Sequence, residues 1–236
     1  MNGESTVVVI PTYNERENLK ELVERIVALK IPNLRLVVVD DNSPDGTGKL
    51  ADELANTYPL RVIHRPYKLG LGKAYTAAFE DILRREKPDY VIQMDADFSH
   101  DPTAIPQFLR EIKKYDIVLG SRYAPGGTIK NWNRARKWIS RFGNAYARIV
   151  LNLPYHDLTG GYKCYKKRVL ETTDLTSLSS VGYNFQIETT YKAHKNGYRI
   201  SEIPITFTER KEGASKFDLP IIIESFIKVL LLRFHA

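Results

Sequence analysis

Apolar positions follow two alternating patterns over the first 120 residues. Short continuous runs rich in β-branched residues, of which Thr6–Ile10 (TVVVI) is the first, are typical of strands buried on both faces. Between these runs, apolar residues recur three or four positions apart. The first such segment begins near Glu15 with acids at its front, as expected at a helix N-terminus. The pattern predicts strands and helices in alternation.

The predicted elements follow one another without a repeat or a long linker. Strands are expected at Thr6–Ile10, Leu34–Val39, Leu60–His64, Tyr90–Met94 and Ile117–Gly120, and helices from Glu15 to Val27 and at Gly46–Asn56, Gly70–Arg85 and Pro106–Lys114. This alternation predicts an α/β fold with a mainly parallel sheet covered by helices on both faces. In such sheets, ligands bind at the carboxyl ends of the strands.

The pattern is less regular after Gly120. We expect a helix around Phe185–Asn196 and a strand-like stretch near Tyr198–Thr208. The last apolar segment, Leu219–Phe234, contains Glu224 and Lys228 and is too short and too charged to cross a bilayer. It is expected to be a buried helix or a helix lying in the plane of a membrane surface.

Composition places the chain among ordinary globular proteins. With 236 residues, of which 43% are hydrophobic, it can build a core within a single domain covering 1–236. Disordered, collagen-like and disulfide-scaffold proteins are excluded. Cys164 is the only cysteine, and no export signal stands at the N-terminus, so a reducing, cytoplasmic setting is expected.

The net charge of +7 is confined to one segment. No Asp or Glu lies between Asp116 and Asp157, and the cations there are Arg122, Lys130, Arg134, Arg136, Lys137, Arg141 and Arg148. Such a segment is typical of a nucleic-acid binder, of a protein on an anionic membrane, or of a phosphate site. Trp132 and Trp138 lie among these cations, as is common at membrane interfaces, although core packing is an equal expectation for Trp138.

Polar clusters follow three of the predicted strands: Pro11–Glu15 (PTYNE), Asp40–Gly46 (DDNSPDG) and Asp95–Asp97 (DAD). A parallel sheet would bring all three to one edge. Taken singly, the first could be only a strand end and helix cap, and the second an Asp/Pro/Gly turn. A calcium-binding EF-hand loop is disfavoured because a strand precedes the second cluster and Asp52 stands where the loop needs Glu.

Asp95 and Asp97 carry the strongest chemical signal. Residues two apart at a strand end point the same way, so the two carboxylates can share one target. A divalent cation would remove their mutual repulsion and leave positions for phosphate oxygens and water. The sequence therefore predicts a metal and nucleoside-diphosphate site, with two solvated loop acids as the alternative.

Five segments in order, PTYNERENL, VVVDDNSPDGT, MDADFSHDP, GSRY and FTERKEGASK, resemble the polyprenyl-phosphate (dolichyl-phosphate) mannose synthases, which are inverting glycosyltransferases of family 2. The resemblance runs from about Thr6 to Lys216. It implies a Rossmann-like GT-A fold with C-terminal interfacial helices. It also implies a nucleotide-sugar half of about residues 1–121 and an acceptor and membrane-facing half of about residues 122–236.

The resemblance also implies roles for individual residues. The positions matching the nucleotide-sugar site are Pro11, Tyr13, Glu15, Val39, Asp41, Asp95, Ala96, Asp97, Arg210 and Lys216. Those matching the acceptor-phosphate site are Arg122, Arg136 and Ser140, and the catalytic positions are Asp95, Asp97, Arg122 and Arg210. Asp97 matches the metal ligand. Ser99 holds the second ligand position, where some relatives have Gln, so contact through water is an alternative there.

The implied reaction transfers mannose from GDP-mannose to a polyprenyl phosphate with inversion, using Mg²⁺ or Mn²⁺. Negative charge develops on the diphosphate as the anomeric C–O bond breaks, and a metal with Arg and Lys stabilises it. The acceptor phosphate is already an anion, so no catalytic base is nominated. The implied setting is peripheral, on the cytoplasmic face of a membrane, with room for a membrane-anchoring protein partner.

Two alternatives stay open from the residues alone. One is a polyprenyl-phosphate glucosyl- or N-acetylglucosaminyltransferase that uses a UDP-sugar, because epimeric sugars differ by a single hydroxyl. The other is a noncatalytic nucleic-acid-binding module that uses the basic segment. The preferred interpretation has no nucleic-acid partner.

Overall fold

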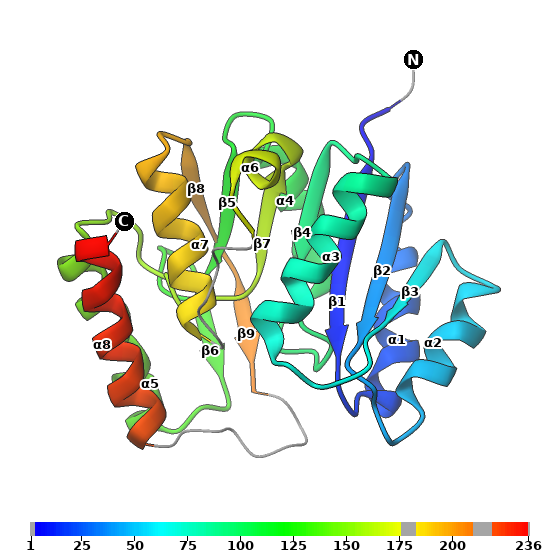
Figure 1. The fold of residues 1–236 in the computed structure, drawn as a ribbon, viewed down its shortest axis with the longest axis horizontal. Coiled ribbons are helices and arrows are strands. Elements are labelled where there is room, and N and C mark those ends of the chain that lie inside the picture. The colour runs from blue at the N-terminus through cyan, green and yellow to red at the C-terminus, as the bar shows by residue number, and fades with distance from the viewer. Residues whose placement is uncertain (1–2, 176–182, 210–218, 236) are drawn as a thin grey trace.

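The computed structural model describes residues 3–175, 183–209 and 219–235. Within these ranges, a sheet of seven strands has the order β3-β2-β1-β4-β7-β5-β8, with helices on both faces (Figure 1). Its strands are β1 (Thr6–Thr12), β2 (Leu34–Asp40), β3 (Leu60–His64), β4 (Tyr90–Gln93), β5 (Ile117–Ser121), β7 (Lys163–Lys166) and β8 (Ile200–Pro204). The predicted α/β fold is confirmed.

The described helices cover both faces and one end of the sheet (Figure 1). They are α1 (Arg16–Val27), α2 (Thr47–Ala55), α3 (Leu71–Arg85), α4 (Ile105–Glu111), α5 (Arg134–Leu151), α6 (Lys167–Thr172), α7 (Tyr183–Lys195) and α8 (Leu219–His235), and a short 3₁₀ turn, Pro102–Ala104, precedes α4. Helices α1, α2 and α4 cover one face of the sheet, and α3 and α7 cover the other (Figure 1). Each layer has its own buried apolar cluster, because the strands carry apolar side chains on both faces.

All five strands and four helices predicted before Gly120 are present, with ends that differ by a few residues. The predicted strand-like stretch at Tyr198–Thr208 is two strands, β8 and β9 (Thr206–Thr208). Strand β9 leaves the main sheet and pairs in parallel with β6 (Thr128–Lys130). This small second sheet brings Phe207 beside His100, next to the Asp95–Asp97 cluster.

Strand β7 interrupts the parallel order, because it lies between β4 and β5 and is antiparallel to both. No strand was predicted at Lys163–Lys166, where two of four residues are lysines. Lys163 is nevertheless fully buried, because its amine donates hydrogen bonds to acceptors on α7. The hydrogen bonds that permit this burial come from a distant helix, which no local pattern reveals.

The basic segment forms α5, which packs against α8 at one end of the sheet (Figure 1). Phe226 of α8 makes ring contacts with Phe142 and Tyr146, and the Tyr146 hydroxyl donates to its carbonyl. Val229 of α8 is buried while Ile227 is half exposed, so α8 is buried on one side only. None of the described helices combines the length and the apolar character that a membrane span requires.

Candidate active site

The first two polar clusters meet at the ends of β1 and β2, as predicted. The backbone amide of Asp41 donates to the Thr12 carbonyl, and the Thr12 hydroxyl donates to Asp40. The Asn14 amide donates to the Ser43 hydroxyl across the two loops. Asp40 and Ser43 therefore hold the loops in place.

Several of the residues predicted for the nucleotide-sugar site surround this junction. Pro11 and Val39 are buried register partners at the strand ends, whereas Tyr13 and Glu15 are half-buried. The Lys68 amine lies 3.4 Å from the centre of the Tyr13 ring. These side chains therefore lie along one strip at the carboxyl edge of β1 and β2.

Asp41 is buried beside this strip and forms an ion pair with Arg65, with 2.6 Å between carboxylate oxygen and guanidinium nitrogen. Burial raises the pKa of the Asp41 carboxyl, although Arg65 opposes the rise. The pair places one carboxylate and one guanidinium at the edge of the predicted nucleotide-sugar site.

Asp95 and Asp97 lie just past the end of β4 and line one cavity of about 220 Å³. Asp95 accepts a hydrogen bond from the Tyr75 hydroxyl at 3.2 Å, and Asp97 accepts one from the Ser99 amide at 3.0 Å. Ala96 between them is buried. The structure thus brings both carboxylates to the same space, as the spacing predicts.

His100 holds the backbone of Asp95 in place. It is buried, stacks on Tyr162 with 4.8 Å between ring centres, and accepts the Asp95 backbone N–H on Nδ1. Burial lowers the pKa of the His100 imidazole, although the nearby Asp95 carboxylate opposes this shift. A neutral ring that accepts through Nδ1 carries its proton on Nε2.

Arg122 and Arg136 line the same cavity as the two acids. The Nε and Nη2 atoms of Arg122 each donate to Asp157 at 2.7 Å, and Nη2 also donates to the Thr159 hydroxyl. Burial acts to raise the pKa of the Asp157 carboxyl, but Arg122 outweighs it and lowers that pKa. Arg122 was expected to bind the acceptor phosphate, but its Nε and Nη2 donors are engaged by Asp157.

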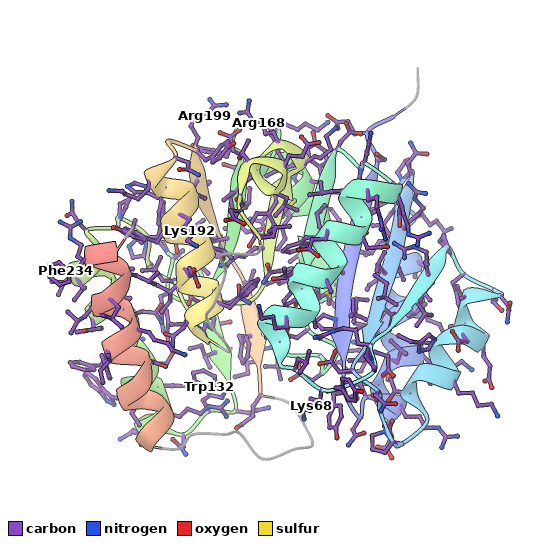
Figure 2. All side chains as sticks on the ribbon, in the orientation of Figure 1. Lys68, Trp132, Arg168, Lys192, Arg199 and Phe234 are labelled. Atoms are coloured by element: carbon purple, nitrogen blue, oxygen red, sulfur yellow. The ribbon has the colours of Figure 1, made fainter. Side chains whose placement is uncertain are left out.

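Arg136 is the second cavity cation, and α5 positions it. Its guanidinium lies 4.2 Å from the Trp132 ring centre and pairs with Glu209. Trp132 lies at the same end of the molecule as Lys68, where the parallel strands have their carboxyl ends (Figure 2). Ser140, one helical turn after Arg136, accepts from the Tyr123 hydroxyl and is not among the described cavity-lining residues.

Several buried polar atoms of cavity-lining residues have no hydrogen-bond partner among the described residues. Among them are the Ser99 hydroxyl, the Trp132 indole nitrogen and the Gln186 amide nitrogen. Buried polar groups are rarely left unsatisfied, so they indicate a site built for a polar ligand. The sequence had indicated Ser99 as a site residue. It had placed Trp132 at a membrane interface, whereas the structure buries Trp132 in the cavity lining. Gln186 was missed, because it carries no local signal.

The donor set fits a divalent metal that also binds its substrate. No group of three or more His, Cys, Asp or Glu residues that could hold a metal is present in the described ranges. Asp95 and Asp97 supply hard carboxylate oxygens that face a cavity, which leaves coordination positions for diphosphate oxygens and water. The predicted cations Arg210 and Lys216 lie outside the described residues.

Comparison with solved structures supports the fold. Glucosyl-3-phosphoglycerate synthase from Mycobacterium tuberculosis superimposes with a TM-score of 0.71, covering 98% of this chain and 80% of that one at 20% identity. The same enzyme has been solved with Mn²⁺ and uridine diphosphate. At this identity the likeness shows a shared GT-A-like fold.

Comparison of sequences shows the family. The model of "Glycosyl transferase family 2" matches residues 7–173. The polyprenol monophosphomannose synthase of Mycolicibacterium smegmatis is 48% identical over 95% of this chain and 85% of its own. The undecaprenyl-phosphate mannosyltransferase of Micrococcus luteus is 43% identical over 94% and 91%. These matches confirm the resemblance carried by the five sequence segments, and the chain therefore belongs to glycosyl transferase family 2, among the polyprenyl-phosphate mannose synthases.

Proposed function

We propose that this enzyme transfers mannose from GDP-mannose to the phosphate of a polyprenyl phosphate with inversion at the anomeric carbon. The observation that carries the proposal is a single cavity lined both by the carboxylates of Asp95 and Asp97 and by the guanidinium groups of Arg122 and Arg136. Two relatives at 43–48% identity are mannosyltransferases of polyprenyl phosphates. The carboxylates suit a metal-bound diphosphate, and the guanidinium groups suit an anionic acceptor.

The donor lies across the carboxyl ends of β1, β2 and β4. Pro11, Tyr13, Glu15, Val39 and Asp41 surround the guanosine, and the rest of the nucleotide-sugar extends to Asp95, Ala96 and Asp97. Asp97 and Ser99 are the residues that would hold Mg²⁺ or Mn²⁺, Ser99 either directly or through water. The bound ion would neutralise charge on the leaving diphosphate, a role shared by Arg210 and Lys216.

The acceptor phosphate reacts from the opposite side of the sugar. Its oxygen forms a bond to the anomeric carbon as the bond to the diphosphate breaks, so the configuration inverts. Because the phosphate is already ionised, no side chain has to remove a proton. Arg136 binds the phosphate, and Arg122 adds positive charge while Asp157 holds it in place. Ser140 lies behind Arg136 on the same helix.

We infer that the paired helices α5 and α8 present this site to a membrane surface. Eight of the exposed large apolar residues lie on these two helices: Trp138, Ile139, Phe142, Ile149, Ile227, Leu230, Leu231 and Phe234. Phe234 projects outward from α8 (Figure 2). Basic residues beside them, among them the exposed Arg134 and Arg141, each add about 1 kcal/mol near an anionic lipid surface. This arrangement favours peripheral binding at the cytoplasmic face over nucleic-acid binding.

A transfer assay tests the proposal. Labelled GDP-mannose, polyprenyl phosphate and Mg²⁺ or Mn²⁺ are expected to give a labelled polyprenyl-phosphate mannose with inverted configuration. UDP-glucose and UDP-N-acetylglucosamine serve as competing donors. Turnover with a UDP-sugar but not with GDP-mannose would refute the donor assignment, and tight metal-independent binding of RNA or DNA without turnover would refute the enzyme.

A further inference from the structure

Gln186 of α7 lines the cavity and is held in place by a chain of buried hydrogen bonds. Its side chain is 2% exposed, and its Oε1 accepts from Gln93 Nε2 at 2.8 Å. Gln93 Oε1 in turn accepts from the Tyr165 hydroxyl at 2.9 Å. The Gln186 backbone carbonyl accepts from the buried Lys163 amine at 2.6 Å. Buried hydrogen bonds therefore hold both oxygen atoms of Gln186, the backbone carbonyl oxygen and the side-chain Oε1.

The remaining polar atom of this side chain, Nε2, has no hydrogen-bond partner among the described residues. A Cβ added to Gly161 would lie 3.5 Å from Gln186 Nε2, 3.5 Å from His100 Cε1 and 3.6 Å from Asp95 Oδ2. The amide nitrogen and the carboxylate therefore face the same small space, which exists because residue 161 has no side chain. Gly161 does not have a positive φ, so this position does not need glycine for its backbone conformation.

We propose that this space receives a hydroxyl group of the transferred hexose, and that Gln186 Nε2 donates a hydrogen bond to that hydroxyl oxygen. A sugar hydroxyl both accepts and donates, so the amide donor and the Asp95 acceptor complement it on two sides. Gln186 is thereby a specificity-determining residue. The inference rests on the proposed function, because the hexose must enter as a nucleoside diphosphate sugar.

Discrimination among donors is the expected consequence. A site built to bond a hydroxyl rejects an analogue without it, because its buried polar group is left unpaired. The wild-type enzyme is expected to use one of the four donors GDP-2-, 3-, 4- and 6-deoxymannose roughly tenfold to a hundredfold less efficiently, in kcat/KM, because that hydroxyl meets Gln186.

The test compares wild type with Gln186→Leu across GDP-mannose and these four deoxy donors. In Gln186→Leu, the penalty for one deoxy donor is expected to fall to within about threefold of unity, while the other three penalties persist. A residue with only a structural role would lower kcat/KM for all donors by the same factor. Gln107→Leu, on α4 and outside the cavity, is the matched control and should leave every ratio unchanged.

Gly161→Ala provides a second route that removes no hydrogen bond. The added methyl makes only ordinary contacts with its three neighbours, so the unfolding midpoint should stay close to wild type. It fills the space, so kcat/KM for GDP-mannose should fall about tenfold, and the donor lacking the critical hydroxyl should lose less. This variant decides the question if Gln186→Leu does not fold.

The assignment of Gln186 would be overturned if, in both variants, the ratio of kcat/KM for GDP-mannose to kcat/KM for each deoxy donor stayed as in wild type. This includes the case in which both variants lose the same factor with every donor. Failure of the proposed function has a different signature, because wild-type enzyme would then show no turnover of GDP-mannose. If wild type uses another nucleoside diphosphate mannose, the deoxy series is prepared with that nucleotide and decides the role of Gln186. If it uses none, the role assigned to Gln186 fails as well.

Discussion

Arg122 and Asp157 form a buried ion pair with two hydrogen bonds. Nε of Arg122 donates to Oδ2 of Asp157 and Nη2 donates to Oδ1, each at 2.7 Å. Both side chains are almost completely buried. A guanidinium that is oriented in this way costs no further ordering when it stabilises charge in the cavity. The pair therefore links the stability of the fold to the basic side of the site.

Replacing Asp157 by Asn should destabilise the protein substantially. The substitution keeps the shape but leaves the buried Arg122 charge uncompensated, and breaking a buried pair in this way costs about 3–5 kcal/mol. The free energy of unfolding, measured with urea at pH 7, checks this. A loss below about 1 kcal/mol would show that Arg122 finds another partner.

The same pair predicts how stability depends on acid. Arg122 lowers the pKa of Asp157 below its usual value, so the folded state favours the ionised carboxyl. Its contribution is fully present above the ordinary Asp pKa of about 3.9 and is lost as pH falls through the lower folded value. Acid unfolding of wild type below about pH 4 should therefore be steeper than that of Asp157→Asn. Acid titrations of the two proteins in parallel measure this difference. Equally steep unfolding in both would show that Asp157 is not the source of the acid dependence.

Asp97→Ala should abolish metal-dependent transfer while the fold survives. Asp97 is half-buried at the cavity wall, and its carboxylate accepts the Ser99 amide. Its loss should lower kcat/KM on the order of a hundredfold or more, because charge stabilisation at the leaving diphosphate is lost. Asp52→Ala, at an exposed acid of α2, is the control. Unchanged activity with an unchanged response to added Mn²⁺ would remove Asp97 from the site.

The sequence predicted the acidic residues of this site, but it did not predict Gln186, which we infer binds a hydroxyl of the sugar. Strands β1, β2 and β4 each contain a continuous apolar run, so their carboxyl ends and the polar clusters that follow could be located from local pattern alone. Gln186 could not, because its unpartnered nitrogen depends on Gln93 and Tyr165, which are distant in sequence. No period or motif encodes such a chain.

The cations of the site show the same contrast between what the sequence predicted and what it did not. The excess of cations between Asp116 and Asp157 indicated a nucleic acid, an anionic membrane or a phosphate as the partner, and Arg122 and Arg136 do reach the cavity. Their partners Asp157 and Glu209 come from later segments, so their ion pairs could not be read from the segment itself. Trp138 was an even choice between core and surface, and it is 70% exposed.

Arg136→Ala should chiefly weaken use of the lipid phosphate. Loss of a charged hydrogen-bond donor costs about 1.5–3 kcal/mol, so KM for the acceptor should rise roughly tenfold to a hundredfold with little change in KM for GDP-mannose. Arg136→Lys should restore part of the effect, because it keeps the charge but not the planar fork. Arg110→Ala on the exposed side of α4 is the control. Equal changes for donor and acceptor would contradict the assignment.

The membrane face predicts a difference between acceptors. Trp138 and Ile149 are 70% and 80% exposed on α5, and removing either apolar side chain should weaken binding to anionic vesicles about tenfold. Trp138→Ser and Ile149→Ser should accordingly lower turnover of a long-chain acceptor held in vesicles. Both variants should turn over a water-soluble short-chain polyprenyl phosphate like wild type. Tyr67→Ser, at an exposed aromatic residue away from α5 and α8, should bind vesicles normally, and equal loss with both acceptors would rule out a docking role.

Lys163 predicts a stability change at the other end of the pH scale. Burial lowers the pKa of its amine to about 7, whereas the unfolded chain keeps the ordinary value near 10.4. Below about pH 7 the folded protein must bury a charged amine, and this cost is relieved as pH rises because the unfolded state then binds more protons. From pH 6 to pH 9, wild type should gain on the order of 2 kcal/mol of stability relative to Lys163→Met. Urea unfolding of both proteins at the two pH values measures this difference. A constant difference would mean that the carbonyl of Gln186 and the hydroxyls of Thr189 and Thr190 keep the amine charged throughout.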